Sequence, residues 1–359
     1  IMTLILTISC LASCGTKPEG VEPEAESKGK DIISIYSGIA NGEASKNVDR
    51  NTFKVGELSK KYTFGYVAGN LGSAYFYVGP NATKDYLESL GCTCLISDAN
   101  ADLATQVSQI ENFITQAVDA IIINSVDPPS GVSEALQKAA EAGIPVVAVD
   151  SFLSDEFTNY LAFVGSDNFK LGYECGVYAA NYMLKTKGAV EGKVCVLDGV
   201  EGNAAATGRY DGFWAGVESV APEHKLEEVS RLYGGGWTEE AGIQMAEDML
   251  VAQPYIDIMF GISDPFVTGA MTATARVGRS EMLMCAVDGQ KAALKLLKDG
   301  TNIKCIAGQD PTGMGLIAAN LLLSFLEDGT LPESRILRIT PVVATPENIN
   351  EIYDANAEF

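Results

Sequence analysis

The sequence predicts an α/β protein built from two similar, doubly wound lobes, each containing a parallel β-sheet. Three observations lead to this fold class: short apolar runs recur along the chain, amphipathic stretches separate them, and the chain has 359 residues. Uninterrupted apolar runs of about four to eight residues are typical of strands buried on both faces of a parallel sheet. Ten such runs exceed one comfortable sheet, and the length suffices for two domains with substantial cores.

The predicted strands alternate with predicted helices along the body of the chain. The helix expected over residues 131–143 has Val132, Leu136 and Ala139 at helical spacing, and it ends at Gly143. Strands joined through helices form parallel sheets. The strands are expected at residues 62–68, 92–97, 119–124, 144–150, 161–166, 192–198, 225–232, 256–261, 282–288 and 303–308.

Polar residues stand at the ends of nearly all these predicted strands. In an open parallel sheet, ligands bind beyond the carboxyl ends of the strands, so these residues mark the expected binding site. They are Asn124, Asp150, Ser151, Asp198, Ser263, Asp264, Asp288, Gln309 and Asp310.

The charge balance excludes one class of partner. The chain has 25 Lys and Arg residues against 47 Asp and Glu residues, which gives a formal net charge of −22. No basic cluster offsets this charge. Such a protein repels phosphate backbones, so we expect no nucleic-acid partner.

The sequence is also poor in residues that enzymes use for acid–base and nucleophilic chemistry. The single histidine, His224, falls in a predicted turn away from the strand ends, and there is no G-x-S-x-G motif. Asp150 and Asp288 could in principle serve a glycosidase, but they occupy positions expected for ligand recognition. There is no CxxC pair, and most cysteines lie in apolar runs where buried thiols are expected. We therefore expect no catalytic residue, no metal site and no cofactor.

The first residues have the pattern of an export signal. Residues 1–12 are uncharged and mostly apolar, and this stretch is too short to span a bilayer as a helix. It ends in Leu11-Ala12-Ser13-Cys14-Gly15, which resembles the bacterial lipobox. We expect a lipoprotein signal peptide at 1–13, and a tether with an unassigned segment at 14–61. Within that segment, residues 32–36 could form a strand. An extracytoplasmic protein, anchored to the bacterial cell membrane through lipid on Cys14, is the expected result.

Several motifs in a fixed order connect the body of the chain to a known family. From about Tyr62 to Ala344 it resembles the type I periplasmic binding proteins, and within them the ribose- and galactose-binding receptors of ABC transporters. The motifs are Ser73-Ala74-Tyr75-Phe76, DAIIIN with Asn124, IPVVAVD with Asp150, VGSDN at 164–168, GNAAATGRYDGF at 202–213, ISD with Asp264, VDG with Asp288, and the loop at Gln309.

The resemblance implies an architecture and a set of ligand contacts. Lobe 1 would comprise residues 62–165 plus 310–340, and lobe 2 residues 166–309 plus 341–359. The two lobes would close on a ligand around a hinge of several strands, and the liganded monomer would dock on the permease subunits. The ligand contacts would be Ser73, Tyr75, Phe76, Asn124, Asp150 and Ser151 on lobe 1, Thr207, Arg209, Trp237, Ser263, Asp264 and Asp288 on lobe 2, and Gln309 at the hinge.

These residue types suit a small polyol, and in particular a monosaccharide. The rings of Phe76 and Trp237 can stack on the apolar C–H face of a sugar. Aspartate carboxylates accept strong hydrogen bonds from hydroxyl groups, and the amides of Asn124 and Gln309 both donate and accept, as hydroxyls do. The sequence therefore predicts capture of a monosaccharide or related polyol for import.

The chain departs from the ribose-type pattern at three positions, which leaves the sugar open. Ser151 and Thr207 stand where the family has arginines, and Ser263 replaces the usual asparagine. Other roles also stay open: Trp237 as a core aromatic, and Asp264 as a helix cap. Arg209 could instead pair with Asp211 or Asp264. The alternative function is a receptor that presents a sugar or another small molecule, such as a nucleoside, to a membrane sensor.

Overall fold

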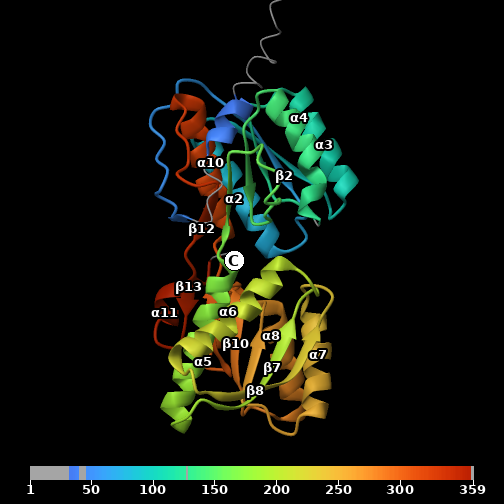
Figure 1. The fold of residues 1–359 in the computed structure, drawn as a ribbon, viewed down its shortest axis with the longest axis vertical. Coiled ribbons are helices and arrows are strands. Elements are labelled where there is room, and N and C mark those ends of the chain that lie inside the picture. The colour runs from blue at the N-terminus through green and yellow to red at the C-terminus, as the bar shows by residue number, and fades with distance from the viewer. Residues whose placement is uncertain (1–31, 40–45, 127, 357–359) are drawn as a thin grey trace, which may run out of the picture.

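The computed structural model describes residues 32–39, 46–126 and 128–356. Two lobes are stacked along the long axis of the molecule, and each consists of a twisted sheet with helices on both faces (Figure 1). The predicted α/β class with two doubly wound lobes is confirmed.

Lobe 1 contains a seven-stranded sheet in the order β1-β12-β6-β5-β4-β2-β3, and all its strand pairs are parallel. Strands β4 and β5 are buried at every position, which is why they are uninterrupted apolar runs. The strands are β1 (Lys46–Val48), β2 (Thr63–Ala68), β3 (Thr93–Asp98), β4 (Ala120–Ile123), β5 (Val146–Val149), β6 (Ala162–Ser166) and β12 (Ile336–Ile339). The helices are α2 (Ala74–Ser89), α3 (Leu103–Thr115), η1 (Pro129–Val132), α4 (Ser133–Glu141) and α10 (Pro311–Asp328).

Lobe 2 contains a six-stranded sheet in the order β13-β11-β10-β9-β7-β8, in which only β13 runs antiparallel to its neighbour. The strands are β7 (Glu191–Asp198), β8 (Lys225–Tyr233), β9 (Ile258–Gly261), β10 (Leu283–Asp288), β11 (Ile303–Gly308) and β13 (Val342–Ala344). The helices are α5 (Asn168–Lys187), α6 (Ala204–Val220), α7 (Glu239–Ala252), α8 (Asp264–Val277), α9 (Lys291–Lys298) and α11 (Ile349–Ile352).

The two sheets share one strand order. In lobe 1, β3-β2-β4-β5-β6 repeats the arrangement of β8-β7-β9-β10-β11 in lobe 2. In each lobe, the first of these strands along the chain lies between the second and the third. This reversal of strand order opens a crevice at the carboxyl edge, where doubly wound sheets bind ligands.

The chain passes between the two sheets three times, from β6 to α5, from β11 to α10 and from β12 to β13. Asp167 lies on the first crossing and caps α5 by accepting a hydrogen bond from the Lys170 amide at 2.9 Å. Gln309 and Asp310 form the second crossing, and Thr340 and Pro341 form the third. These connections form the hinge region between the lobes.

The structure differs from the sequence predictions mainly at the two ends of the body. Residues 32–38, which the sequence left unassigned with a strand as one possibility, are helical, because Ile32, Tyr36 and Ile39 recur at helical spacing and bury their side chains in lobe 1. Strands β1, β12 and β13 were not predicted, since each has only three or four residues and is buried at only some of them. No helix in the described ranges is long and apolar enough to cross a membrane. Cys14 and the predicted signal peptide lie outside the described residues.

Candidate ligand-binding site

Five polar side chains meet at the carboxyl edges of the two sheets. Tyr75 lies in the first turn of α2, Asn124 follows β4, and Asp150 follows β5. Asp288 ends β10, and Gln309 follows β11. The local order of strand, polar residue and helix places these groups toward the opposite lobe, as doubly wound topology requires.

Two of the carboxylates sit on strained backbone. Asp150 has a φ of 64° and Asp288 a φ of 134°, both in the region that side chains with a Cβ atom rarely adopt. Such conformations cost on the order of 1–3 kcal/mol each and persist where the surrounding structure enforces them. Their occurrence at both carboxylates points to a functional placement of these side chains.

On lobe 1, Asp150 is the centre of the polar contacts. The Tyr75 hydroxyl donates to Asp150 Oδ1 at 2.5 Å, and Asn124 Nδ2 donates to Asp150 Oδ2 at 3.0 Å. Burial raises the pKa of Asp150, although both hydrogen bonds counteract this rise. Burial and the negative charge of Asp150 raise the pKa of Tyr75 well above its usual value, so Tyr75 is a neutral phenol.

On lobe 2, Asp288 accepts hydrogen bonds from four donors. Gln309 Nε2 lies at 2.7 Å and Arg209 Nη1 at 3.1 Å from Asp288 Oδ1. Ser263 Oγ lies at 2.6 Å and the Asp264 amide nitrogen at 3.3 Å from Asp288 Oδ2. Because Asp288 is only 5% exposed, these donors take the place of water around its carboxylate.

Arg209 is a buried cation that links helices and strand ends in lobe 2. Its Nη1 also donates to the Ile262 carbonyl at 2.8 Å, and its Nε donates to Asn168 Oδ1 at 2.9 Å. The Trp237 ring centre lies 5.8 Å from Arg209 Cζ, within cation–π range. Arg209 thus pairs with an aspartate, but the partner is Asp288 instead of Asp211 or Asp264, the two that the sequence suggested.

Close packing of α5 against α6 fixes the backbone position of Arg209. A Cβ atom added at Gly172 on α5 would lie 1.8 Å from the Arg209 carbonyl oxygen on α6. Only glycine allows the helices to approach so closely at this point. The sequence of α5 therefore contributes to the geometry of a side chain that lies on the other helix.

Asp264 has the contacts of a residue that holds a loop. Its Oδ2 accepts hydrogen bonds from the amides of Gly289 at 2.8 Å and Gln290 at 2.6 Å, and Ser263 rather than Asp264 is the N-cap of α8. Its Oδ1 is buried without a hydrogen-bond partner among the described residues. Burial and the nearby charge of Asp288 raise the pKa of Asp264 well above its usual value.

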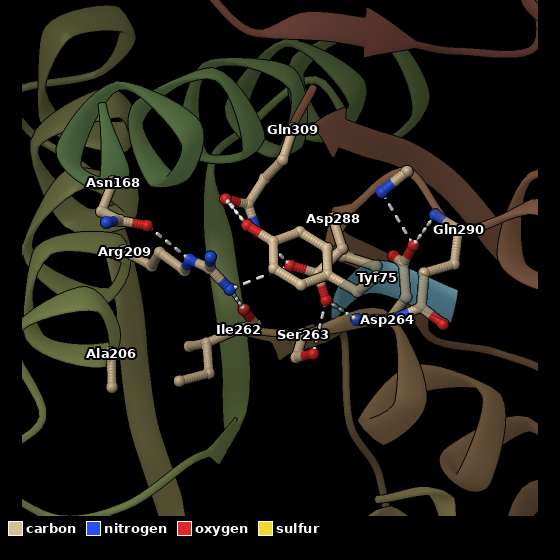
Figure 2. Close-up of polar contacts among 12 residues, drawn as sticks. Tyr75, Asn168, Ala206, Arg209, Ile262, Ser263, Asp264, Asp288, Gln290 and Gln309 are labelled. Atoms are coloured by element: carbon tan, nitrogen blue, oxygen red, sulfur yellow. Dashed lines mark hydrogen bonds and ion pairs between the residues drawn. The ribbon is translucent and has the colours of Figure 1, made fainter. Parts of the chain in front are cut away.

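Gln309 joins the contacts of the two lobes into one network. Its Oε1 lies 2.9 Å from the Tyr75 hydroxyl, while its Nε2 contacts Asp288 (Figure 2). The sequence of contacts runs from Asp150 through Tyr75 and Gln309 to Asp288 and Arg209. Polar groups from both lobes therefore face one another through hydrogen bonds that a ligand can replace.

The other predicted contacts lie around this network. Phe76 packs edge-on against the Tyr75 ring, with ring centres 5.1 Å apart. The Trp237 ring stacks on Phe266, with ring centres 5.8 Å apart, which is the packing of a core aromatic, and it also lies beside Arg209. Among the described residues, the side chains of Ser73, Ser151 and Thr207 make no hydrogen bond to the network, and Ser73 and Thr207 are exposed.

Two supporting groups were missed by the sequence reasoning. Asn168 orients Arg209, and the Gly289 and Gln290 amides bind Asp264. Asn168 follows β6 and belongs to the VGSDN motif, so its position after a strand was an available signal. The amide contacts depend on loop geometry and have no side-chain signature.

The fold and this network define a class of protein: a two-lobed, ligand-binding protein whose site lies between the lobes. The family model described as "Periplasmic binding protein domain" matches residues 64–330, and the chain belongs to the type I periplasmic binding proteins. Proteins of this family are extracytoplasmic solute-binding components of ABC importers and are not enzymes. The same holds for this protein.

Individual relatives support the family assignment. The ribose import binding protein RbsB of Bacillus subtilis is 30% identical over 259 residues, covering 72% of this chain and 80% of the relative. An ABC transporter solute-binding protein from Mycobacterium smegmatis, solved with bound glycerol, is 26% identical with a TM-score of 0.72, covering 84% of this chain and 99% of that one. A solute-binding protein from Bacillus halodurans, solved with bound myo-inositol, is 26% identical with a TM-score of 0.70 and the same two coverages.

Proposed function

We propose that this protein captures a small polyol, and in particular a monosaccharide, between its lobes and presents it to the permease subunits of an ABC importer. The observation that carries the proposal is the hydrogen-bond network from Asp150 to Arg209 across the lobes. Ribose, glycerol and myo-inositol, the ligands in the names of the relatives, all carry several hydroxyl groups. A shared chemistry of recognition is therefore reasonable for this chain.

The network suits hydroxyl groups because each of its members can exchange an internal partner for a ligand partner. Asp150 and Asp288 accept from hydroxyl donors through charge-assisted bonds. Asn124 and Gln309 donate and accept, which matches the two roles of a hydroxyl. Because the carboxylates are desolvated, a ligand that lacks the matching hydroxyl leaves them unpaired and binds much more weakly.

We assign the remaining contacts on the same reasoning. Phe76 and Trp237 supply aromatic faces for the C–H side of the ring, and Asp264 supports the site through the loop that it holds. The proposed contact set is completed by Ser263, which donates to Asp288, and by three residues around the network, Ser73, Ser151 and Thr207. The moving units are residues 62–165 with 310–340 and residues 166–309 with 341–359, and closure between them is the signal to the permease.

The proposal includes a lipid anchor and a monomeric state. The lipobox-like stretch at Cys14 and the acidic, proline-containing residues 16–31 support a tether to the outer face of the cell membrane. The described chain begins at Ile32, where a helix packs on lobe 1. A tether that ends there holds a single copy of the protein near the membrane and leaves its two lobes free to close.

A thermal-shift screen of the purified protein tests the ligand class. The panel contains monosaccharides, polyols, nucleosides and amino acids. A compound present at about 100 times its dissociation constant stabilises the folded state by roughly 2.7 kcal/mol, which gives a clear rise in melting temperature. Hits among monosaccharides or polyols support the proposal. Hits only among nucleosides or amino acids overturn the polyol and leave the family assignment unchanged.

Metabolic labelling with palmitate tests the anchor. Bacterial cells expressing the chain should incorporate the label, and the Cys14→Ala variant should not. Cys10→Ala is the matched control, because Cys10 lies in the same apolar stretch but follows Ile8-Ser9 and precedes Leu11, whereas Cys14 follows Ala12-Ser13 and precedes Gly15. Equal labelling of the wild type and the Cys14→Ala variant would rule out the anchor.

A further inference from the structure

The second crossing between the lobes carries a residue of the ligand network. The Gln309 amide donates to the Asp288 carbonyl at 2.7 Å, and its side chain contacts Asp288 and Tyr75. The next residue, Asp310, is the N-cap of α10 and accepts from the Gly313 amide at 2.8 Å. The direction of the chain at Asp310 therefore decides where Gln309 sits between the lobes.

An N-terminal segment that precedes the matched family domain reaches this crossing. The family match begins at residue 64, whereas β1 is already the edge strand of the lobe 1 sheet and pairs with β12. The blue N-terminal residues lie beside the red α10 in lobe 1 (Figure 1). We call residues 46–52, which comprise β1 and the turn after it, the N-terminal brace.

The turn of the brace holds Arg50 in a defined position. The Asn51 amide donates to Asp49 Oδ1 at 2.7 Å, and the Thr52 amide donates to the Asp49 carbonyl at 3.1 Å. The Asp49 amide in turn donates to Thr52 Oγ1 at 2.9 Å. With the strand pairing of β1 on one side and this turn on the other, the backbone of Arg50 is fixed relative to lobe 1.

The guanidinium group of Arg50 forms a bidentate ion pair with the carboxylate of Asp310. Arg50 Nε donates to Asp310 Oδ2 at 2.9 Å, and Arg50 Nη2 donates to Asp310 Oδ1 at 2.6 Å. A bidentate pair fixes the plane and direction of the carboxylate as well as its distance. The same carboxylate caps α10, so Arg50 and the cap together hold the crossing at its lobe 1 end.

We infer that Arg50 is a positioning residue for the hinge, which acts through Asp310 to place Gln309 and so limits the range of lobe openings. Its role differs from that of an ordinary surface ion pair. The Arg50 side chain is 52% exposed, and an exposed pair contributes only about 0–1 kcal/mol to folding stability. The consequence of losing it is therefore expected in the lobe geometry, with little change in overall stability.

Pulsed electron–electron double resonance measures the distances between spin labels on the two lobes, and the measurement needs no ligand. Glu134 and Glu240 are exposed residues in the first turns of α4 and α7, which start at the carboxyl edges of their sheets. Both are replaced by labelled cysteines in a full chain with Cys10 and Cys14 replaced by serine. The six cysteines in the described part of the chain are buried, so they do not take the label.

The Arg50→Gln variant should broaden the distribution of distances between the lobes toward longer values. Arg50→Lys, which keeps the charge but loses the fork, should broaden it less. Lys46→Gln is the matched control, because Lys46 lies on β1 and pairs with Glu333, away from the crossing. All variants should keep the wild-type melting temperature within a few degrees.

Two results would overturn the inference. One is a distribution for Arg50→Gln that superimposes on that of the unsubstituted chain. The other is an equal broadening for Arg50→Gln and Lys46→Gln, which would make the effect a general loosening of β1. Neither depends on the identity of the ligand, so this test and the ligand screen fail independently.

Discussion

The Asp288→Ala substitution should destabilise lobe 2 strongly, because it leaves a buried cation and three other donors without their acceptor. Asp288 and Arg209 are each 5% exposed, and their atoms lie 3.1 Å apart. Breaking a buried ion pair by removing one partner costs about 3–5 kcal/mol. Arg209 keeps its bonds to Ile262 and Asn168, and Asp264 loses a repulsive neighbour, so we expect the lower part of this range, about 3 kcal/mol.

Denaturant unfolding measures this loss, and Asp198→Ala provides a matched comparison. Asp198 also ends a strand in lobe 2 and is fully buried, but its partner Arg231 has a side chain that is 24% exposed and gains access to water when the carboxylate is removed. The expected loss is therefore smaller for Asp198→Ala. An Asp288→Ala loss below about 1 kcal/mol, or one no greater than that of the comparison, would refute the reasoning.

Ligand affinity separates a binding role of Asp288 from a purely structural one. For a sugar identified in the screen, Asp288→Ala should weaken binding at least tenfold, or about 1.4 kcal/mol. Asp198→Ala should leave the affinity unchanged. A smaller decrease for Asp288→Ala would contradict its proposed place at the centre of the hydroxyl contacts.

Three further changes test other parts of the site. Tyr75→Phe removes the hydroxyl that contacts Gln309 and should lower the free energy of unfolding by about 1 kcal/mol while weakening sugar binding, measured by denaturation and calorimetry. Because the folded-state pKa of Asp264 is raised, its contribution to stability is full below about pH 4 and is lost as the pH rises through the folded value, so Asp264→Asn should flatten the decline of melting temperature from pH 4 upward. Gly172→Ala forces α5 and α6 apart at Arg209 and should lower both the melting temperature and sugar affinity.

Matched variants separate these effects from general damage. Tyr86→Phe removes a hydroxyl that donates to Asn320 within lobe 1 at 2.5 Å, so it should lower stability without changing sugar affinity. Gly56→Ala places a Cβ atom where nothing lies within 4 Å and should change neither property. Equal losses of affinity in Tyr75→Phe and Tyr86→Phe would contradict the role of the cross-lobe contact. If the melting temperature of Asp264→Asn declined with pH in parallel with the wild type, Asp264 would not be the cause of that decline.

Much of the fold was predictable because burial on both faces of a parallel strand leaves a plain pattern. Strands β4 and β5 are buried at all four positions, and both were predicted from their apolar runs. Two of the four edge strands, β1 and β13, escaped prediction, since they are short and partly exposed. The helix at residues 32–38 was ambiguous from sequence because its few apolar residues fit either period over so short a stretch.

The candidate site was predictable to the extent that it follows the strand ends. Asn124, Asp150 and Asp288 each stand at or directly after a buried strand, where the topology collects polar groups at one edge. The pairing among them was not predictable. Arg209 pairs with Asp288 rather than with Asp211 or Asp264, the two partners that the sequence suggested, because the pairing depends on side-chain geometry across α6, β9 and β10.

The sequence by itself determined the α/β class, the two lobes, the polar strand ends and the net negative charge, because these depend on composition and on local patterns of burial. Only the tertiary structure decided which lobe 1 groups reach which lobe 2 groups through Gln309. It alone also brought Arg50 to Asp310, 260 residues further along the chain. The physical reason is that burial leaves a periodic record in the sequence, whereas a contact between distant residues depends on how whole elements pack.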